Sequence, residues 1–237
     1  MIKIKKMDNI NSNPDKYYLH IEGMDLAGKS TASKIFAQIS GIQWIIHDKR
    51  LTQDNPIYDF ALGLSKKDGF NSEALGYMYL AALMQDIKNF KLDANIIQDS
   101  TLLLRSLNYY KNVNLNNELA HAFSNLIQQH PTPNKSFYLA ADICSRRQRL
   151  AQRIKIAPEK LTSMDLLIQN DPNRFIQIDE SLQDLSITIF NSEVIDTSKM
   201  SVMEVVKYIQ KSYSTSMRRI VSSPGITNRR SDAKGKK

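Results

Sequence analysis

The stretch GMDLAGKS, residues 23–30, constrains the fold more than any other part of the 237-residue chain, because it fits the pattern G-x-x-x-x-G-K-[S/T]. Gly23 and Gly28 allow the backbone to curl so that successive N–H groups point toward one anion. The β-rich run YYLHIE precedes the loop, and the segment KSTASKIFAQIS after it has helical apolar spacing. This order of strand, glycine loop and helix is the setting in which the pattern binds phosphate at the positive end of the helix.

Individual side chains of this loop have predicted roles toward a bound nucleoside triphosphate. Lys29 can reach the β- and γ-phosphates, and the hydroxyl of Ser30 can ligate magnesium. The sequence therefore predicts ATP and Mg²⁺ as cofactors. The residues expected to bind the nucleotide are Gly23, Ala27, Gly28, Lys29, Ser30 and Thr31.

Short apolar runs recur along the chain and predict further strands after residues 17–22. They cover 42–47, 94–99, 136–141 and 193–196, and helical patterns separate them. Short buried strands that alternate with helices are typical of a parallel sheet covered on both faces. We therefore expect an α/β fold of the P-loop NTPase type, with a five-stranded parallel sheet, helices on both faces and a short lid.

Helical spacing is clearest in the segment that begins near Ser72, where apolar residues recur at i, i+3, i+4, i+7 and i+8. Helices are also predicted over 29–40, 102–110, 118–129 and 202–213. An arginine-rich helix follows the fourth strand directly, and we place the lid near residues 146–162 in that region.

The third predicted strand ends in a carboxylate, Asp99. Folds of this type hold magnesium at this position, usually through water, so Ser30 and Asp99 are the predicted metal residues. The alternative role for Asp99 is a helix N-cap, which the pair Asp99-Ser100 suits well.

The arginine-rich helix carries four arginines, of which three share a face. Arg146 and Arg149 are three residues apart, and Arg149 and Arg153 are four apart, whereas Arg147 points elsewhere. Cationic groups beside a transferring phosphoryl group neutralise the charge on its oxygens. The alternative is a solvated basic helix face.

A charged loop, His47-Asp48-Lys49-Arg50, follows the second strand. It lies at the edge of a parallel sheet where ligands bind, so Lys49 or Arg50 could hold a phosphate of an acceptor. An ordinary charged loop explains the same residues equally well.

The net charge of +8 comes from the two ends of the chain, because residues 1–16 carry +2, residues 217–237 carry +6 and the rest is neutral. We predict a basic N-terminal extension over 1–16, a P-loop kinase-like domain over 17–213 and a disordered basic tail over 214–237. A neutral body does not favour nucleic acid as a partner, although contact of the tail with a polyanion stays an alternative.

No apolar run approaches the roughly 18 residues of a membrane helix, and the N-terminus lacks the apolar segment of a signal peptide. The single cysteine, Cys144, cannot form an intramolecular disulfide. We therefore expect a cytoplasmic protein without a membrane partner.

The string EGMDLAGKST resembles the opening motif of the thymidylate kinase family of P-loop nucleoside monophosphate kinases, position for position from Glu22 to Thr31. The strings YLAALMQ, QDSTLLLRSLNYY, YLAADICSRRQRLAQR and EVIDTSKMSVMEVVKYI resemble later segments of that family, so the likeness covers about residues 17–213. The resemblance implies that Asp25 faces the acceptor sugar near the phosphates. It also implies that Arg149 and Arg153 form the Arg-x-x-x-Arg at the entrance to the lid.

The chain departs from the family pattern on the acceptor side. Met84 stands at the helix position where the family has an arginine that holds the acceptor, and Ser100 replaces the arginine after the strand-three aspartate. The segment DKRLTQ replaces the family's Arg-Glu-Pro. The donor-side residues are thus present and the acceptor-side arginines are not.

These observations predict ATP- and magnesium-dependent phosphoryl transfer to a small acceptor, with Lys29, Asp25, Arg149 and Arg153 as the catalytic residues. The acceptor is a nucleoside monophosphate or a related small molecule. The alternatives are an ATPase that acts on a macromolecular partner and a kinase of a non-nucleotide small molecule. The sequence does not fix the oligomeric state and leaves a homodimer open.

Overall fold

The computed structural model describes residues 16–67 and 69–221, and its centre is a sheet of five parallel strands. The strand order is β2-β3-β1-β4-β5, so the strand that leads into the glycine loop is the central one. The strands are β1 Tyr18–Glu22, β2 Ile45–Asp48, β3 Ile96–Asp99, β4 Lys135–Ala140 and β5 Glu193–Asp196.

Helices connect the strands in every crossover of this sheet. Polar caps fix where several of them begin; for example, Asp171 caps α8, and Pro172 occupies the first helical position, where its missing N–H costs nothing. The α-helices are α1 Lys29–Ile39, α2 Pro56–Ser65, α3 Ser72–Asn89, α4 Leu102–Asn112, α5 Asn117–Ser124, α6 Ile143–Ile156, α7 Ser163–Asn170, α8 Pro172–Phe190 and α9 Val202–Val221, and a 3-10 turn, η1, covers Pro158–Lys160.

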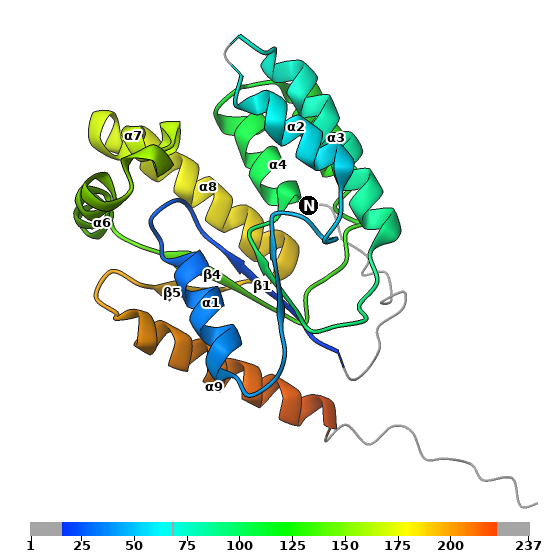
Figure 1. Cartoon of the computed structure of the whole chain (residues 1–237), viewed down its shortest axis with the longest axis vertical. Helices are drawn as coiled ribbons and strands as arrows, with labels where there is room; N and C mark the ends of the chain where they lie inside the picture. The colour runs from blue at the N-terminus through cyan, green and yellow to red at the C-terminus, as the bar shows by residue number, and fades with distance from the viewer. Residues whose placement is uncertain (1–15, 68, 222–237) are drawn as a thin grey trace, which may run out of the picture.

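The sheet has a helical layer on each face (Figure 1). Side chains alternate along each strand, so Leu19 and Ile21 pack with α1 and α9, where Phe36 and Val206 are fully buried. Tyr138 projects to the other face, into a core built with α3, α4, α5 and α8. Burial on both faces explains why the strands read as short apolar runs in the sequence.

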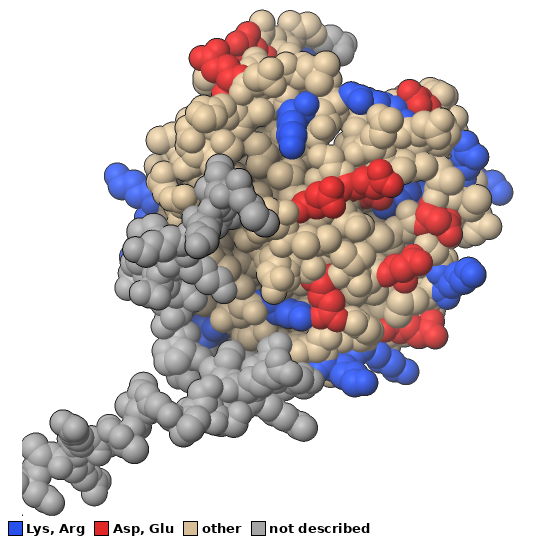
Figure 2. All heavy atoms as spheres, turned by 180° about the vertical axis from the view of Figure 1, so that it is seen from behind, with Lys and Arg blue, Asp and Glu red and all other residues tan. Residues whose placement is uncertain are grey.

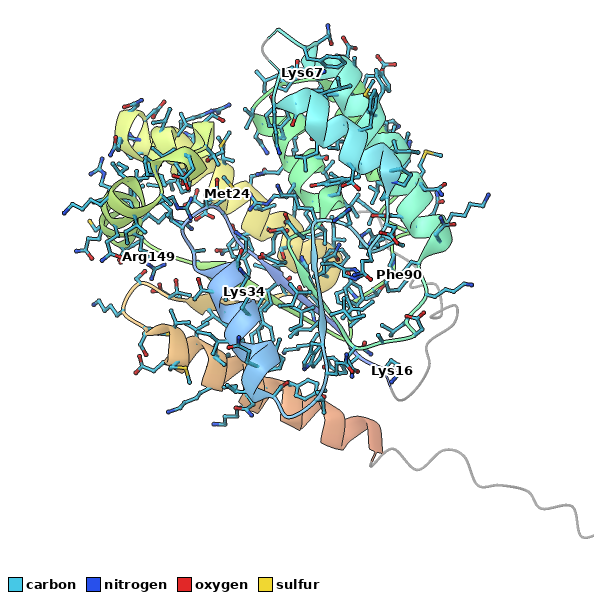
Figure 3. All side chains as sticks on the ribbon, in the orientation of Figure 1. Lys16, Met24, Lys34, Lys67, Phe90 and Arg149 are labelled. Carbon is cyan, nitrogen blue, oxygen red and sulfur yellow. The ribbon has the colours of Figure 1, made fainter. Side chains whose placement is uncertain are left out.

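The carboxyl ends of the five parallel strands meet at one end of the sheet, the end from which the glycine loop extends. In Figure 3, Met24 on the glycine loop and Arg149 on α6 lie at this end, and Lys16 and Phe90 lie at the opposite end. Three residues at this end, Leu26, Lys49 and Ser100, have positive φ angles of 64°, 59° and 69°. Non-glycine residues seldom adopt such angles, and they cluster at functional sites.

The five strands appear where the sequence predicts them, with shifts of a few residues at their ends. β2 begins at Ile45 instead of Ile42, because Trp44 packs against Phe36 and Tyr213 and donates to Ser40 Oγ over 2.8 Å. The last helix was predicted over 202–213 and continues to Val221. Residues 1–15 and 222–237, which hold most of the predicted extension and tail, lie outside the described residues.

Two features of the described residues concern membranes and surface charge. None of the helices within 16–67 and 69–221 is long and apolar enough to cross a membrane. On the face drawn in Figure 2, Lys and Arg side chains lie scattered among Asp and Glu side chains.

Candidate active site between the glycine loop and helices α2–α4

The loop between β1 and α1 has a conformation that its sequence requires. Gly23 has a φ of 145°, and a Cβ atom there would collide with the backbone carbonyl oxygen of Leu139 on β4. Gly28 has a φ of 94° and occupies the N-cap position of α1. Only glycine reaches these angles without strain, so both glycines of the motif are fixed by the backbone.

The N-terminus of α1 is open to an anion. Helices α2 to α8 each begin with an Asn, Asp or Thr whose side chain accepts a hydrogen bond from a first-turn N–H. The cap of α1 is Gly28, which has no side chain to do so, and the first turn holds no acidic residue. The first N–H groups of α1 and its positive dipole end are therefore available to a phosphate.

Lys29, Ser30 and Asp99 meet beside this helix terminus. Nζ of Lys29 donates to the carbonyl oxygen of Met24 over 3.2 Å, which holds the ammonium group against the loop. Burial lowers the pKa of Lys29, and the charge of Arg105 adds to this, although three nearby carboxylates oppose it. Burial raises the pKa of Asp99, although Lys29 and a hydrogen bond from Ser30 oppose the rise.

The residues present suit magnesium. The hydroxyl of Ser30 and the carboxylate of Asp99 are in contact, and both are hard oxygen ligands. Magnesium is typically held by one or two such protein ligands together with the phosphates of its substrate. The described residues contain no cluster of three or more His, Cys, Asp or Glu side chains, so a dedicated all-protein metal cage is not formed by them.

A cavity of about 670 Å³ opens in front of the glycine loop, and we call it the donor cavity. Arg149 lines it from α6 and donates to the carbonyl oxygens of Leu26 and Thr197 over 2.9 and 2.7 Å. Arg153 also lines it, and its Nη1 lies 3.0 Å from Oδ2 of the buried Asp165. Its lining includes all of the predicted nucleotide-binding residues except Gly23.

Of the three arginines predicted to share a face of α6, Arg146 does not line the donor cavity with Arg149 and Arg153. Arg146 is buried, with 1% of its surface exposed, and pairs with Asp179 on α8 across 2.8 Å. It also donates to the backbone carbonyl of Asp25. Arg146 therefore ties α6 and α8 to the glycine loop, and it neither faces the donor cavity nor lies on a solvated face. Arg147 points elsewhere, as predicted, and donates to the carbonyl oxygen of Ile168.

A second cavity of about 500 Å³ lies between the glycine loop and helices α2, α3 and α4, and we call it the acceptor cavity. Four tyrosines give it an aromatic wall, and the start of α7 closes one side with Thr162 and Met164. Ser106 and Tyr109, which belong to the string QDSTLLLRSLNYY of the sequence analysis, both line it. The four tyrosines are Tyr58, Tyr79, Tyr109 and Tyr110.

Asp25 lines both cavities and marks where they meet. Its Oδ2 accepts a hydrogen bond of 2.9 Å from Oγ1 of Thr162, and its Oδ1 lies 3.7 Å from Nη2 of Arg105. Burial alone would raise the pKa of Asp25, but the charges of Arg105 and Lys29 outweigh it, and the pKa lies below its usual value. Asp25 is therefore a carboxylate at neutral pH.

Arg105 is a site residue that the sequence analysis missed. It extends from α4 toward the glycine loop, where Nη2 donates to the carbonyl oxygen of Gly23 over 2.9 Å. Its Nε lies 3.2 Å from Oε1 of the fully buried Glu22. The signal was a lone charge within the apolar helix start LLLRSL, since a charge among buried residues needs a buried partner.

The buried carboxylate of Glu22 is well stabilised. It accepts hydrogen bonds from the backbone N–H groups of Gly23 and Thr101 over 3.0 and 3.1 Å. Burial by itself opposes its charge, but Arg105 and the other polar neighbours lower the pKa of Glu22 to about 2.

The two cations of the charged loop after β2 separate in the structure. Lys49 lines the acceptor cavity, as one prediction required. Arg50 pairs with Asp59 across 3.0 Å and lies over the ring of Tyr58, so it is outside the cavity lining.

The two positions at which the chain lacks a family arginine lie away from the lining of the acceptor cavity. Met84 lies on the outer side of α3 with 54% of its surface exposed, and it does not line the acceptor cavity. Ser72, Leu75 and Tyr79 are the α3 residues that do. Ser100 is buried at the turn after β3, where its N–H bonds the carbonyl oxygen of Ile21.

Comparison with known proteins reveals similarity in structure alone. No protein-family model and no curated protein sequence matches the chain. Thymidylate kinase from Candida albicans has a TM-score of 0.54 and 15% identity, over 84% of this chain and 92% of that one.

Deoxyadenosine kinase from M. mycoides is also similar. Its structure with the products dCMP and a flexible dCDP has a TM-score of 0.54 and 18% identity, over 84% of this chain and 99% of that chain. Its structure with bound dATP has a TM-score of 0.55 and 19% identity, over 83% of this chain and 99% of that chain. At these identities the likeness concerns the fold. The chain has the α/β fold of the P-loop nucleotide kinases, with an all-parallel five-stranded sheet in the order 2-3-1-4-5.

Proposed function

We propose that the protein is a kinase that transfers the γ-phosphoryl group of ATP to a small acceptor. The observation that carries this proposal is the meeting of two cavities at Asp25, one lined by the glycine loop and the other by aromatic residues of α2, α3 and α4. A phosphoryl donor in the first cavity and an acceptor in the second would place the reacting groups next to each other. An ATPase that acts on a macromolecular partner has no need of the second cavity.

The donor half of the reaction uses the glycine loop. The open N-terminus of α1 binds the phosphates, and Lys29 lies against the loop where the β- and γ-phosphates bind. Ser30 and Asp99 would hold magnesium, which when bound neutralises charge on the phosphate oxygens. Arg149 and Arg153 line the same cavity from α6 and add positive charge from the opposite side.

The acceptor half of the reaction depends on orientation. Asp25 is ionised and can accept a hydrogen bond from the acceptor's hydroxyl group, which aligns its oxygen with the phosphoryl group. The tyrosine-lined wall suits a planar ring, because aromatic side chains stack on such groups. Thymidylate and deoxyadenosine kinases among the structural neighbours are consistent with a nucleoside or nucleoside monophosphate acceptor.

A coupled assay with ATP as donor tests the proposal across the common nucleosides and their monophosphates. We expect the protein to phosphorylate at least one of these compounds, and to do so only when magnesium is present. Thymidine monophosphate is expected below about 1 per second, the lower end of ordinary enzyme turnover, because the α3 residues that line the acceptor cavity, Ser72, Leu75 and Tyr79, carry no positive charge to replace the family arginine. Binding of magnesium-ATP without turnover of any acceptor would instead support the ATPase alternative.

A further inference from the structure

Arg105 lies on the acceptor side of the glycine loop, opposite Lys29. Both cations contact the same short segment of backbone: Arg105 donates to the carbonyl oxygen of Gly23 and Lys29 to that of Met24. Arg105 lines the acceptor cavity and Lys29 lines the donor cavity. Asp25, which lines both, has its Oδ1 3.7 Å from Nη2 of Arg105. A group that passes from one cavity to the other therefore passes between these two cations.

The guanidinium group of Arg105 is held in place from one side. Glu22 is fully buried and its Oε1 lies 3.2 Å from Nε, and Nη2 donates to the carbonyl oxygen of Gly23 over 2.9 Å. Nη1 points at Sδ of Met24, 3.1 Å away, and Met24 also lines the acceptor cavity. A thioether is a weak acceptor, whereas an oxyanion forms strong, charge-assisted hydrogen bonds with arginine. An anion in the cavity would therefore displace Met24 as the partner of Nη1.

We propose that Arg105 binds a phosphoryl group at the junction of the two cavities and that it takes the place of the arginine absent at Ser100. The inference rests on the proposed kinase function. Ser100 is buried in the turn after β3, and Arg105 reaches the same end of the sheet from the first turns of α4. The phosphoryl group is either the one in transfer or one that the acceptor carries, and both present the same oxyanion to Nη1.

The test measures binding to the full-length protein and to its Arg105→Lys variant, which keeps the charge beside Glu22 but loses the guanidinium geometry. One arm compares magnesium-ADP with and without aluminium fluoride, a mimic of the transferring phosphoryl group. The second arm adds each nucleoside or its monophosphate in the presence of saturating magnesium-ADP. Arg50→Lys is the matched control, because Arg50 is also paired with a carboxylate and lies outside the cavity lining. Should Arg105→Lys not fold, a double variant, Glu22→Gln with Arg105→Gln, removes both buried charges together.

We expect Arg105→Lys to bind magnesium-ADP as the wild type does and to lose about tenfold or more of the affinity in one arm, the effect of one charge-assisted hydrogen bond. Loss in the aluminium fluoride arm assigns Arg105 to the phosphoryl group in transfer. Loss only in the monophosphate arm assigns it to the acceptor's own phosphate. The inference is overturned if a folded variant loses nothing in either arm, if Arg50→Lys loses as much, or if the wild type gains affinity in neither arm. Failure of the wild type to bind magnesium-ADP is a separate result, which would refute the kinase proposal itself.

Discussion

Thr162 and Asp25 are 137 residues apart in the chain, and Oγ1 of Thr162 donates a 2.9 Å hydrogen bond to Oδ2 of Asp25. The same hydroxyl accepts the N–H of Asp165 and so caps α7, and Asp165 in turn binds Arg153. One side chain thus connects the glycine loop, the start of α7 and an arginine of the donor cavity. The end of the segment predicted as a lid therefore contacts the glycine loop.

Thr162→Val is expected to lower the free energy of unfolding by roughly 1 kcal/mol, the usual effect of losing an N-cap, and to change nucleotide affinity as well. Thr162→Ser should retain both, because serine keeps the hydroxyl group. Asn116→Ala, which removes the cap of α5 outside either cavity lining, should affect stability only. Urea unfolding and ADP titration measure the two effects. Equal nucleotide affinity in all four proteins would show that the Asp25 contact has no role in binding.

Lys29→Ala should abolish nucleotide turnover and leave the fold intact. The environment lowers the pKa of Lys29, which means that the protein does not favour its charged form, so removal of the charge is not expected to cost stability. Lys34→Ala is the control, because Lys34 is an exposed lysine of the same helix. ATP turnover and thermal melting measure both outcomes, and turnover in Lys29→Ala comparable to that of the control would refute the assignment of the glycine loop.

Gly23→Ala should destabilise the protein by more than about 1 kcal/mol and weaken nucleotide binding, since alanine at a φ of 145° is strained and its Cβ meets the carbonyl oxygen of Leu139. Gly63→Ala makes the same change in the last turn of α2, where no atom lies within 4 Å of the added Cβ. There alanine should stabilise by roughly 0.5–1 kcal/mol. Denaturant unfolding of both variants measures the two changes in the free energy of unfolding. Similar changes in the two variants would contradict the geometry of the glycine loop.

His130 should make the protein less stable as the pH falls below its ordinary pKa of 6.5. Burial lowers the pKa of His130 in the folded protein to about 3, with His20 contributing and a hydrogen bond to Pro131 opposing. Between pH 6.5 and pH 3 the unfolded chain binds a proton at His130 that the folded protein does not bind. The contribution of neutral His130 to the free energy of unfolding is therefore fully present above pH 6.5 and is lost as the pH falls toward 3. The expected slope is about 1.4 kcal/mol per pH unit in excess of that of His130→Gln. Urea unfolding of both proteins between pH 6.5 and 4.5 measures it, and parallel curves would rule out a buried neutral His130.

The sequence by itself determined the parts of the protein that depend on neighbouring residues. The spacing of Gly23, Gly28 and Lys29 specifies the loop, because backbone angles and the helix terminus are local properties. The five strands were recognisable as apolar runs because the sheet is covered on both faces. Asp99 could be assigned to the end of a strand from the apolar run ANIIQD alone, and folds of this type hold magnesium at that position.

The tertiary structure decided which distant side chains meet. Arg105 forms an ion pair with Glu22, 83 positions earlier in the chain. Arg146 forms an ion pair with Asp179, although helical spacing places Arg146 on the same face as Arg149. Met84 stands where the family motif has an arginine, and it lies on the solvent side of α3. Spacing along a helix fixes which residues share a face, and the packing of whole elements fixes what that face contacts. The phosphate-binding part of the donor cavity could be predicted because one continuous segment, residues 25–32, builds it, whereas the acceptor cavity required the packing of α2, α3 and α4 around the loop.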